Sequence, residues 1–91
     1  MATHKSAIKR AKQSEARRQR NRVVKTRVKS VVKEVRIALE KQSAEEAKTA
    51  LQNAVPVIDR AVSKGVLHHR TAARKIARLS KKVHALSTEQ E

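Results

Sequence analysis

The chain has 91 residues, a formal net charge of +15 and a sequence pI of about 11.4, with no Phe, Tyr, Trp or Cys. Its length allows one domain, and the lack of cysteine excludes disulfides and thiolate metal sites. The lack of aromatic rings excludes base stacking on rings, which most sequence-reading single-strand binders use. No apolar run approaches the roughly 20 residues of a membrane span.

The positive charge is distributed unevenly along the chain. Residues 1–36 hold 13 basic and 2 acidic side chains, residues 37–60 have a net charge of −1, and residues 61–91 have a net charge of +5. Cations at this density repel one another unless a polyanion neutralises them, which indicates a nucleic-acid partner. An organelle transit peptide is disfavoured because the Arg-rich start lacks a clear apolar face.

Three stretches repeat apolar residues at alternating spacings of three and four, and the single Gly and single Pro favour long helices. The first stripe consists of Val24, Val28, Val31, Val35 and Ala38. The second consists of Ala44, Ala47, Leu51, Ala54, Ile58 and Ala61. The third consists of Ala72, Ile76, Leu79, Val83 and Leu86. Three facing stripes predict an all-α fold, a three-helix bundle.

Local signals mark the ends of these helices. Ser43, three residues before a glutamate, predicts a capping box that opens the second helix. Gly65 is typical of the left-handed residue that closes a helix, and His68 or His69 is expected to begin the third helix. The apolar period runs through Pro56, so we expect a kink there and not a break.

The first helix is expected over about residues 5–41, a length of roughly 55 Å at ~1.5 Å per residue. The stretch before Val23 has few apolar residues, so this half of the helix should project beyond the bundle. We therefore predict a single domain over residues 1–91, with a basic arm (residues 1–22) and a bundle (residues 23–87). Because the arm has no packing partner and its cations repel one another, it should become ordered only when it binds RNA.

Cations of the first and third helices fall in rows roughly opposite the apolar stripes. The row of the first helix consists of Arg18, Arg22, Lys25, Lys29, Lys33 and Arg36. The row of the third helix consists of Arg70, Arg74, Arg78 and Lys81. A solvated helix face normally mixes both signs of charge, whereas residues 1–36 contain only Glu15 and Glu34 as acids. The rows therefore favour phosphate binding.

The cations of the arm point in nearly every direction around a helix. They are Lys5, Lys9, Arg10, Lys12, Arg17, Arg18 and Arg20. A helix that is cationic on all sides suits insertion between nucleic-acid segments, where phosphates surround it. A flexible basic tail with diffuse contacts is the alternative.

The sequence predicts no enzyme, no metal site and no cofactor. No two of the four histidines are four residues apart with a carboxylate between them, and no serine has an evident base and orienting partner. His68 and His69 suit helix capping or phosphate contact. The complete set of predicted RNA-binding residues is Lys5, Lys9, Arg10, Lys12, Arg17, Arg18, Arg20, Arg22, Lys25, Arg27, Lys29, Lys33, Lys64, His68, His69, Arg70, Arg74, Lys75 and Arg78.

Three runs of residues match the pattern of one known family. The first, near the start, is Ser6-Ala7-Ile8-Lys9-Arg10, followed by Gln13-Ser14-Glu15, Arg17 and Asn21. The second, in the middle, is Pro56-Val57-Ile58-Asp59-Arg60. The third is Lys64-Gly65-Val66-Leu67-His68, followed by Ala72-Ala73-Arg74 and Arg78-Leu79. Together they resemble the S-twenty family of bacterial small-subunit ribosomal proteins, over essentially the whole chain. Thr3-His4 and Thr71 depart from residues that are frequent in the family, an Asn and a Lys.

The resemblance implies a three-helix bundle with an extended first helix that binds 16S ribosomal RNA directly, as an early assembly protein. It implies contacts to the 5′ domain and to the long stem of the 3′ minor domain, and only peripheral contacts to other small-subunit proteins. It also implies a monomer within the ribosome, in the cytoplasm. Carried over by motif, the RNA contacts are Lys9, Arg10, Arg17, Lys64, His68, Arg74 and Arg78.

The residues themselves predict that two basic rows hold separate RNA stems, with the first helix as a strut between them. Architectural DNA compaction remains an alternative, disfavoured by the lack of Lys-Ala-Pro repeats and of apolar wedge residues. A membrane-active amphipathic helix over residues 24–39 is a second alternative, but its apolar side is short, and we expect no membrane partner. The valine stripe would also suit oligomerisation, although an intramolecular bundle uses the same surface.

Overall fold

A computed structural model describes the backbone of residues 2–89 and the side chains from His4 to Glu89. It contains three helices, α1 (Ala2–Glu40), α2 (Ala44–Ser63) and α3 (His69–Glu89). The described residues contain no strand, so the predicted all-α class is confirmed. Residues 1 and 90–91 of the predicted domain, and the side chain of Thr3, lie outside the described part.

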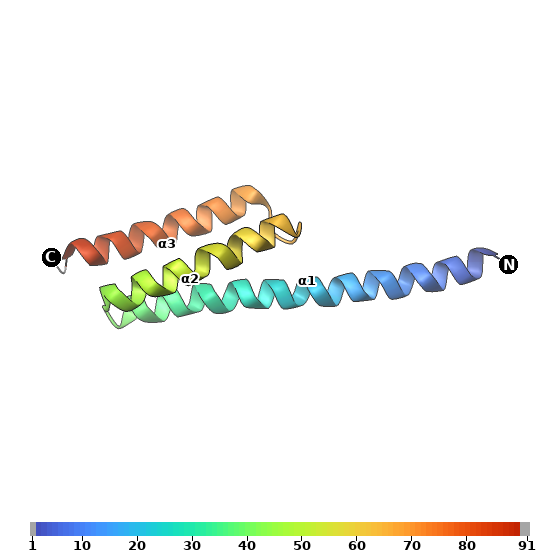
Figure 1. Ribbon diagram of the computed structural model, residues 1–91, viewed down its shortest axis with the longest axis horizontal. Coiled ribbons are helices and arrows are strands. Elements are labelled where there is room, and N and C mark those ends of the chain that lie inside the picture. The colour runs from blue at the N-terminus through green and yellow to red at the C-terminus, as the bar shows by residue number, and fades with distance from the viewer. Residues whose placement is uncertain (1, 90–91) are drawn as a thin grey trace.

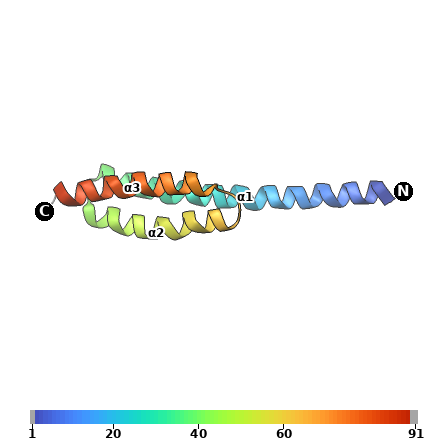
Figure 2. The same ribbon diagram turned by 90° about the horizontal axis from the view of Figure 1, so that it is seen from above.

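The helices form a narrow bundle with a long extension at one end (Figure 1). α2 folds back along the C-terminal half of α1, and α3 folds back along α2 (Figures 1 and 2). α1 packs mainly on α2 and touches α3 least. The N-terminal half of α1 continues alone beyond the bundle, so the principal extents are 71 × 21 × 14 Å. The prediction of an extended first helix that projects from the bundle is confirmed.

The core is built from the three predicted apolar stripes. Its buried side chains are Val28, Val31, Val35 and Ala38 of α1, Ala47, Ala54, Ile58 and Ala61 of α2, and Ala72, Leu79 and Val83 of α3. Three of the four buried α2 residues are alanines spaced by seven, so α2 presents small side chains that let neighbouring helices approach closely. Toward the arm the core ends at Val24, which is half-buried, while every side chain from His4 to Val23 is exposed.

The junction between α1 and α2 is short because Ser43 takes part in both the end of α1 and the start of α2. Gln42 is left-handed, with φ of 57°, and its N–H donates to Leu39 O at 3.0 Å. Ser43 N donates to Ala38 O at 3.2 Å, which completes a Schellman motif at the end of α1. The Ser43 hydroxyl accepts from Glu46 N at 3.3 Å and caps α2. The predicted N-cap is confirmed. In a full capping box the Glu46 side chain would accept from Ser43 N, but here Ser43 N donates to Ala38 O instead.

α2 continues without a break through Pro56 and ends in a second Schellman motif. Gly65 is left-handed, with φ of 74°, and its N–H donates to Val62 O at 2.9 Å. Val66 N donates to Ala61 O at 3.0 Å. The prediction that Gly65 closes the second helix is confirmed, and a kink at Pro56 stays a prediction.

Candidate nucleic-acid interface

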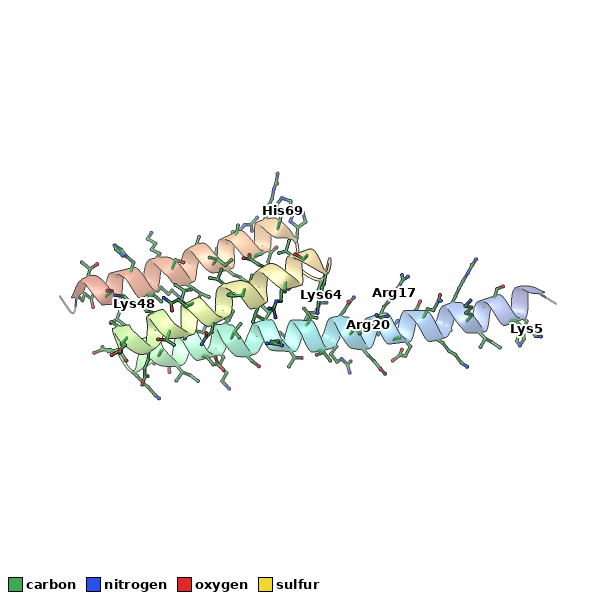
Figure 3. The ribbon with its side chains drawn as sticks, viewed as in Figure 1. Lys5, Arg17, Arg20, Lys48, Lys64 and His69 are labelled. Atoms are coloured by element: carbon green, nitrogen blue, oxygen red, sulfur yellow. The ribbon has the colours of Figure 1, made fainter. Side chains whose placement is uncertain are left out.

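The arm presents cations around its whole circumference. Every described side chain before Val24 is exposed, including all seven cations predicted to surround the arm. Figure 3 shows side chains projecting from both sides of α1 beyond the bundle, among them Lys5, Arg17 and Arg20. No other element covers this part of α1 (Figures 1 and 2). A ligand therefore has access to the arm from all sides.

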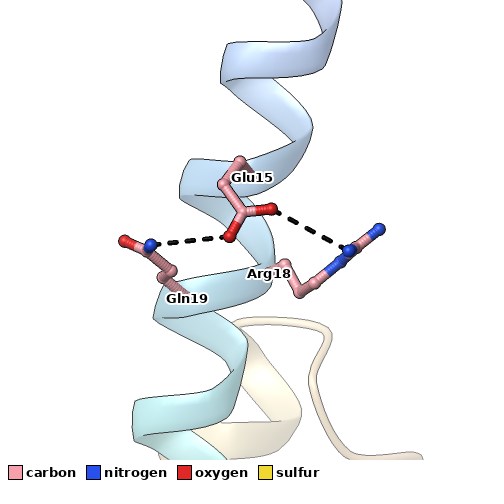
Figure 4. Close-up of polar contacts among 3 residues, drawn as sticks. All are labelled: Glu15, Arg18 and Gln19. Atoms are coloured by element: carbon pink, nitrogen blue, oxygen red, sulfur yellow. Dashed lines mark hydrogen bonds and ion pairs between the residues drawn. The ribbon is translucent and has the colours of Figure 1, made fainter.

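Glu15 is the one acidic residue of the arm, and it is partnered within its own helix (Figure 4). Its carboxylate lies 3.8 Å from Arg18 Nη1 and accepts a bond of 3.5 Å from Gln19 Nε2. The Arg18 and Glu15 side chains are 76% and 58% exposed, so this pair contributes at most about 1 kcal/mol. Among the side chains described here it is the sole ion pair, and the other cations keep their charge uncompensated.

The row of cations on α1 lies on the surface, outside the buried valine stripe. All six members from Arg18 to Arg36 are exposed, and so is Arg27, which was predicted from the same helix. The apolar face of residues 24–39 packs into the core instead. A membrane or a second chain would need that apolar face, and the bundle itself occupies it.

The row of cations on α3 is exposed in the same way, at Arg70, Arg74, Arg78 and Lys81. Lys75 is half-buried and is the only predicted RNA-binding residue that is not fully on the surface. A lysine in such a position can pack its methylene stem against neighbouring side chains and keep its ammonium group in water. Its predicted contact with RNA stays a prediction.

The turn between α2 and α3 ends in two stacked histidines. His68 Nδ1 accepts from Arg70 N at 3.1 Å and so caps α3, which begins at His69. The two imidazole rings lie 4.3 Å apart between centroids, at 27°. The capping role and the helix start are confirmed. Because Nδ1 is the acceptor, neutral His68 carries its proton on Nε2, where it is able to donate to a phosphate.

Sequence reasoning missed Arg60, which the fold brings to the predicted cations. Arg60 lies in the last turn of α2, and it lines one hollow with Arg27 of α1 and with Lys64. It was not predicted to bind RNA because it lies in the near-neutral segment of residues 37–60. The available signal was its position four residues before Lys64, which places both on one side of a helix end.

The opposite end of the bundle has an acidic hollow. It lies beside the α1–α2 junction and is lined by Glu34, Glu45 and Glu46, with Lys41 among them. This end lies farthest from the arm (Figure 1). Negative side chains repel phosphate, so a nucleic-acid interface should run from the arm over the two basic rows and avoid this hollow.

The described residues hold no cluster of three or more His, Asp or Glu that would suit a metal ion. No described helix combines the length and the apolar character needed to cross a membrane.

Comparison with known proteins supports one family. The small ribosomal subunit protein bS20 of Nitratidesulfovibrio vulgaris strain DP4 is 59% identical over 87 residues, which cover 96% of this chain and 100% of that protein. Proteins of the same name from Desulfatibacillum aliphaticivorans and Syntrophobacter fumaroxidans are each 55% identical, covering 96% and 94% of this chain and 99% and 100% of their own lengths. The family described as ribosomal protein S20 matches residues 2–84. The chain therefore belongs to the ribosomal protein S20 family of bacteria, the S-twenty family that its sequence resembles.

Proposed function

We propose that this protein binds 16S ribosomal RNA directly, through phosphate and shape contacts, and bridges RNA stems during assembly of the small ribosomal subunit. The family is one of structural, non-enzymatic ribosomal proteins, which act in the cytoplasm as part of the ribosome.

The observation that carries the proposal is the uncompensated positive surface. All predicted RNA-binding side chains except Lys75 are exposed, and within the described part only Arg18 has a carboxylate partner. A folded protein gains little from such a surface in isolation, because the cations repel one another. RNA phosphates supply the missing negative charge and release counterions on binding.

The bridging role follows from where the cations lie. The arm offers charge on all sides, whereas the rows on α1 and α3 each offer charge on one side of the bundle. One stem on each row, with α1 as a strut, would bring two stems together while their repulsion is neutralised. The resemblance assigns these stems to the 5′ domain and the 3′ minor domain. The protein would act there as a monomer, with other small-subunit proteins only at its periphery.

The recognition should depend on A-form geometry, with phosphate and 2′-hydroxyl groups as the contacted atoms. The described residues place arginine and lysine on the surface and offer no aromatic ring other than the imidazoles. These imidazoles and the arginine planes are the groups on which an exposed base would stack.

The test is a salt titration of binding to fragments of 16S rRNA, combined with chemical footprinting of the RNA. With roughly 6–10 phosphate contacts, affinity should fall about 10³–10⁵-fold between 50 and 200 mM salt. Duplex DNA of equal length serves as the competitor. A nearly flat salt response, or equal binding to the duplex DNA, would overturn the proposal.

A further inference from the structure

A notch opens where α1 leaves the bundle, between α1 and the turn that follows α2. We define it by Arg20, Val23 and Arg27 of α1, Arg60 of α2, and Lys64 and Val66 of the turn. Its larger part has a volume of about 620 Å³, within the usual size of ligand pockets. It is open to solvent, and it lies at the root of the arm.

Four cations converge on the notch from parts of the chain that are distant in sequence. Arg20 and Lys64 line its outer part, and Figure 3 shows Lys64 lying between the turn and α1, near Arg20. Arg27, Arg60 and Lys64 line its inner part. None of these side chains has a carboxylate partner among the described residues. The notch is thus a concave cationic site that exists only when α1 and α2 are packed together.

The floor of the notch is apolar, which plain phosphate binding does not require. Val23 is 67% exposed, more than the other large exposed hydrophobic residues, Ile8 and Ile37, at 46% and 40%. Val24, Val57 and Val66 are half-buried beside it. Two amide side chains, Gln19 and Asn21, stand at the rim in the same hollow. Val23 is therefore an apolar surface surrounded by hydrogen-bond donors.

We infer that the notch binds one unpaired nucleotide of the RNA together with its flanking phosphates. The inference rests on the proposed function, because the ligand is taken to be the RNA that the arm and rows bind. A nucleotide combines an apolar sugar and base face with adjacent negative charge, and so it matches the valine floor and the surrounding cations. A paired nucleotide would not fit, because its base faces are stacked inside the duplex.

The notch is continuous with the predicted interface on both sides. Arg20 belongs to the arm, and Lys64 begins the turn that leads to His68 and α3. An RNA strand that follows the arm toward α3 would therefore cross the notch. An unpaired residue at that crossing lets the strand change direction without leaving the cations.

Two variants separate the charge of the notch from its floor. Arg60→Ala should reduce the slope of log affinity against log salt by about 0.7–0.9, the value for one phosphate contact. Val23→Ala should lower affinity about three- to tenfold at every salt concentration and leave the slope unchanged, as expected for two lost methyl groups. Because alanine has the higher helix propensity, this loss would not come from a weakened helix.

Each variant has a matched control at the opposite end of the bundle. Lys48→Ala removes an exposed cation of α2 far from the notch, and Ile37→Ala truncates another exposed hydrophobic residue of α1. Binding is measured on full-length protein with 16S rRNA fragments, and thermal unfolding of each variant checks the fold. The controls should bind as the unchanged protein does.

The outcomes separate the two proposals. If the unchanged protein shows a steep salt response while Arg60→Ala and Val23→Ala match their controls, the notch is refuted and the proposed function stands. If only Arg60→Ala weakens binding, the notch holds a phosphate and the nucleotide assignment is wrong. If the unchanged protein shows no salt-dependent binding to rRNA, the proposed function fails and the notch fails with it.

Discussion

Two of the residues with a described backbone adopt left-handed conformations, and they occupy equivalent positions at the ends of α1 and α2. Gly65 takes φ of 74° without steric cost, because glycine has no Cβ. Gln42 takes φ of 57° at the corresponding position after α1, where a side chain is disfavoured by roughly 1–2 kcal/mol. The two Schellman motifs are alike in backbone hydrogen bonding and differ in the residue type at the left-handed position.

Exchanging residue types at these positions should shift stability in opposite directions. Gln42→Gly should raise the free energy of unfolding by up to about 1 kcal/mol, since relief of strain exceeds the entropy that glycine adds to the unfolded chain. Gly65→Ala should lower it by about 1 kcal/mol; no atom lies within 4 Å of the added Cβ, so the loss is conformational. Urea unfolding of the free protein measures both, and a neutral Gly65→Ala would contradict the assignment.

Helix α3 has a buried apolar face and an exposed cationic face, and the adjacent residues Leu79 and Arg78 lie on one face each. Leu79 is 5% exposed and belongs to the core, whereas Arg78 is exposed and belongs to the cationic row. Burial of Leu79 stabilises the bundle by removing its side chain from water, while Arg78 has no partner in the described part of the protein that its loss would disturb.

Leu79→Ala should therefore lower the free energy of unfolding by about 2–5 kcal/mol, with a cavity left in a thin core. Arg78→Ala should change it by less than about 0.5 kcal/mol and weaken RNA binding instead. Chemical unfolding and an rRNA binding titration on both variants supply the comparison. Similar losses of stability would mean that the faces of α3 are assigned the wrong way round.

The sequence predicts the helices and the core well because both depend on periodic local signals. The spacing of Val28, Val31 and Val35 identifies a face without knowledge of its partner, and Gly65 identifies a helix end. Gln42 carries no comparable signal, because glutamine is not a residue type that favours the left-handed conformation. Arg60 likewise joins Arg27 only through packing between helices, which no local period encodes.

At the scale of the whole molecule, positive charge is unevenly distributed along the long axis. The arm occupies one end, and the hollow of Glu34, Glu45 and Glu46 occupies the other. The first turn of α1 contains no acidic residue, so its helix dipole is not offset and the nearby cations oppose helix formation there. Phosphates around the arm would offset the helix dipole and neutralise the repulsion between the cations. The bundle is stabilised by its buried core and does not depend on phosphates.

The free protein should therefore be less helical than the three observed helices together require. Addition of rRNA should raise the far-UV circular dichroism signal at 222 nm as residues 2–22 become ordered, since their helix lacks packing partners. The RNA contribution is subtracted with a matched blank. Full helicity before RNA is added refutes the prediction that the arm is ordered only on RNA.

Removal of residues 1–15 tests what the arm does in the assembled complex. The bundle should keep its stability within about 0.5 kcal/mol, because burial begins only at Val24. The deletion removes four cations, Lys5, Lys9, Arg10 and Lys12, so the salt slope of rRNA binding should fall by about 3 if each meets a phosphate.

Footprinting of the same truncated protein distinguishes an inserted helix from a flexible tail. A helix enclosed by phosphates protects fixed nucleotides on more than one RNA segment, and its deletion should abolish those protections while the protections due to the rows persist. A tail with diffuse contacts would lose affinity without losing any discrete protection. Since the arm of α1 is helical, cationic on all sides and projects beyond the bundle, we expect the first result.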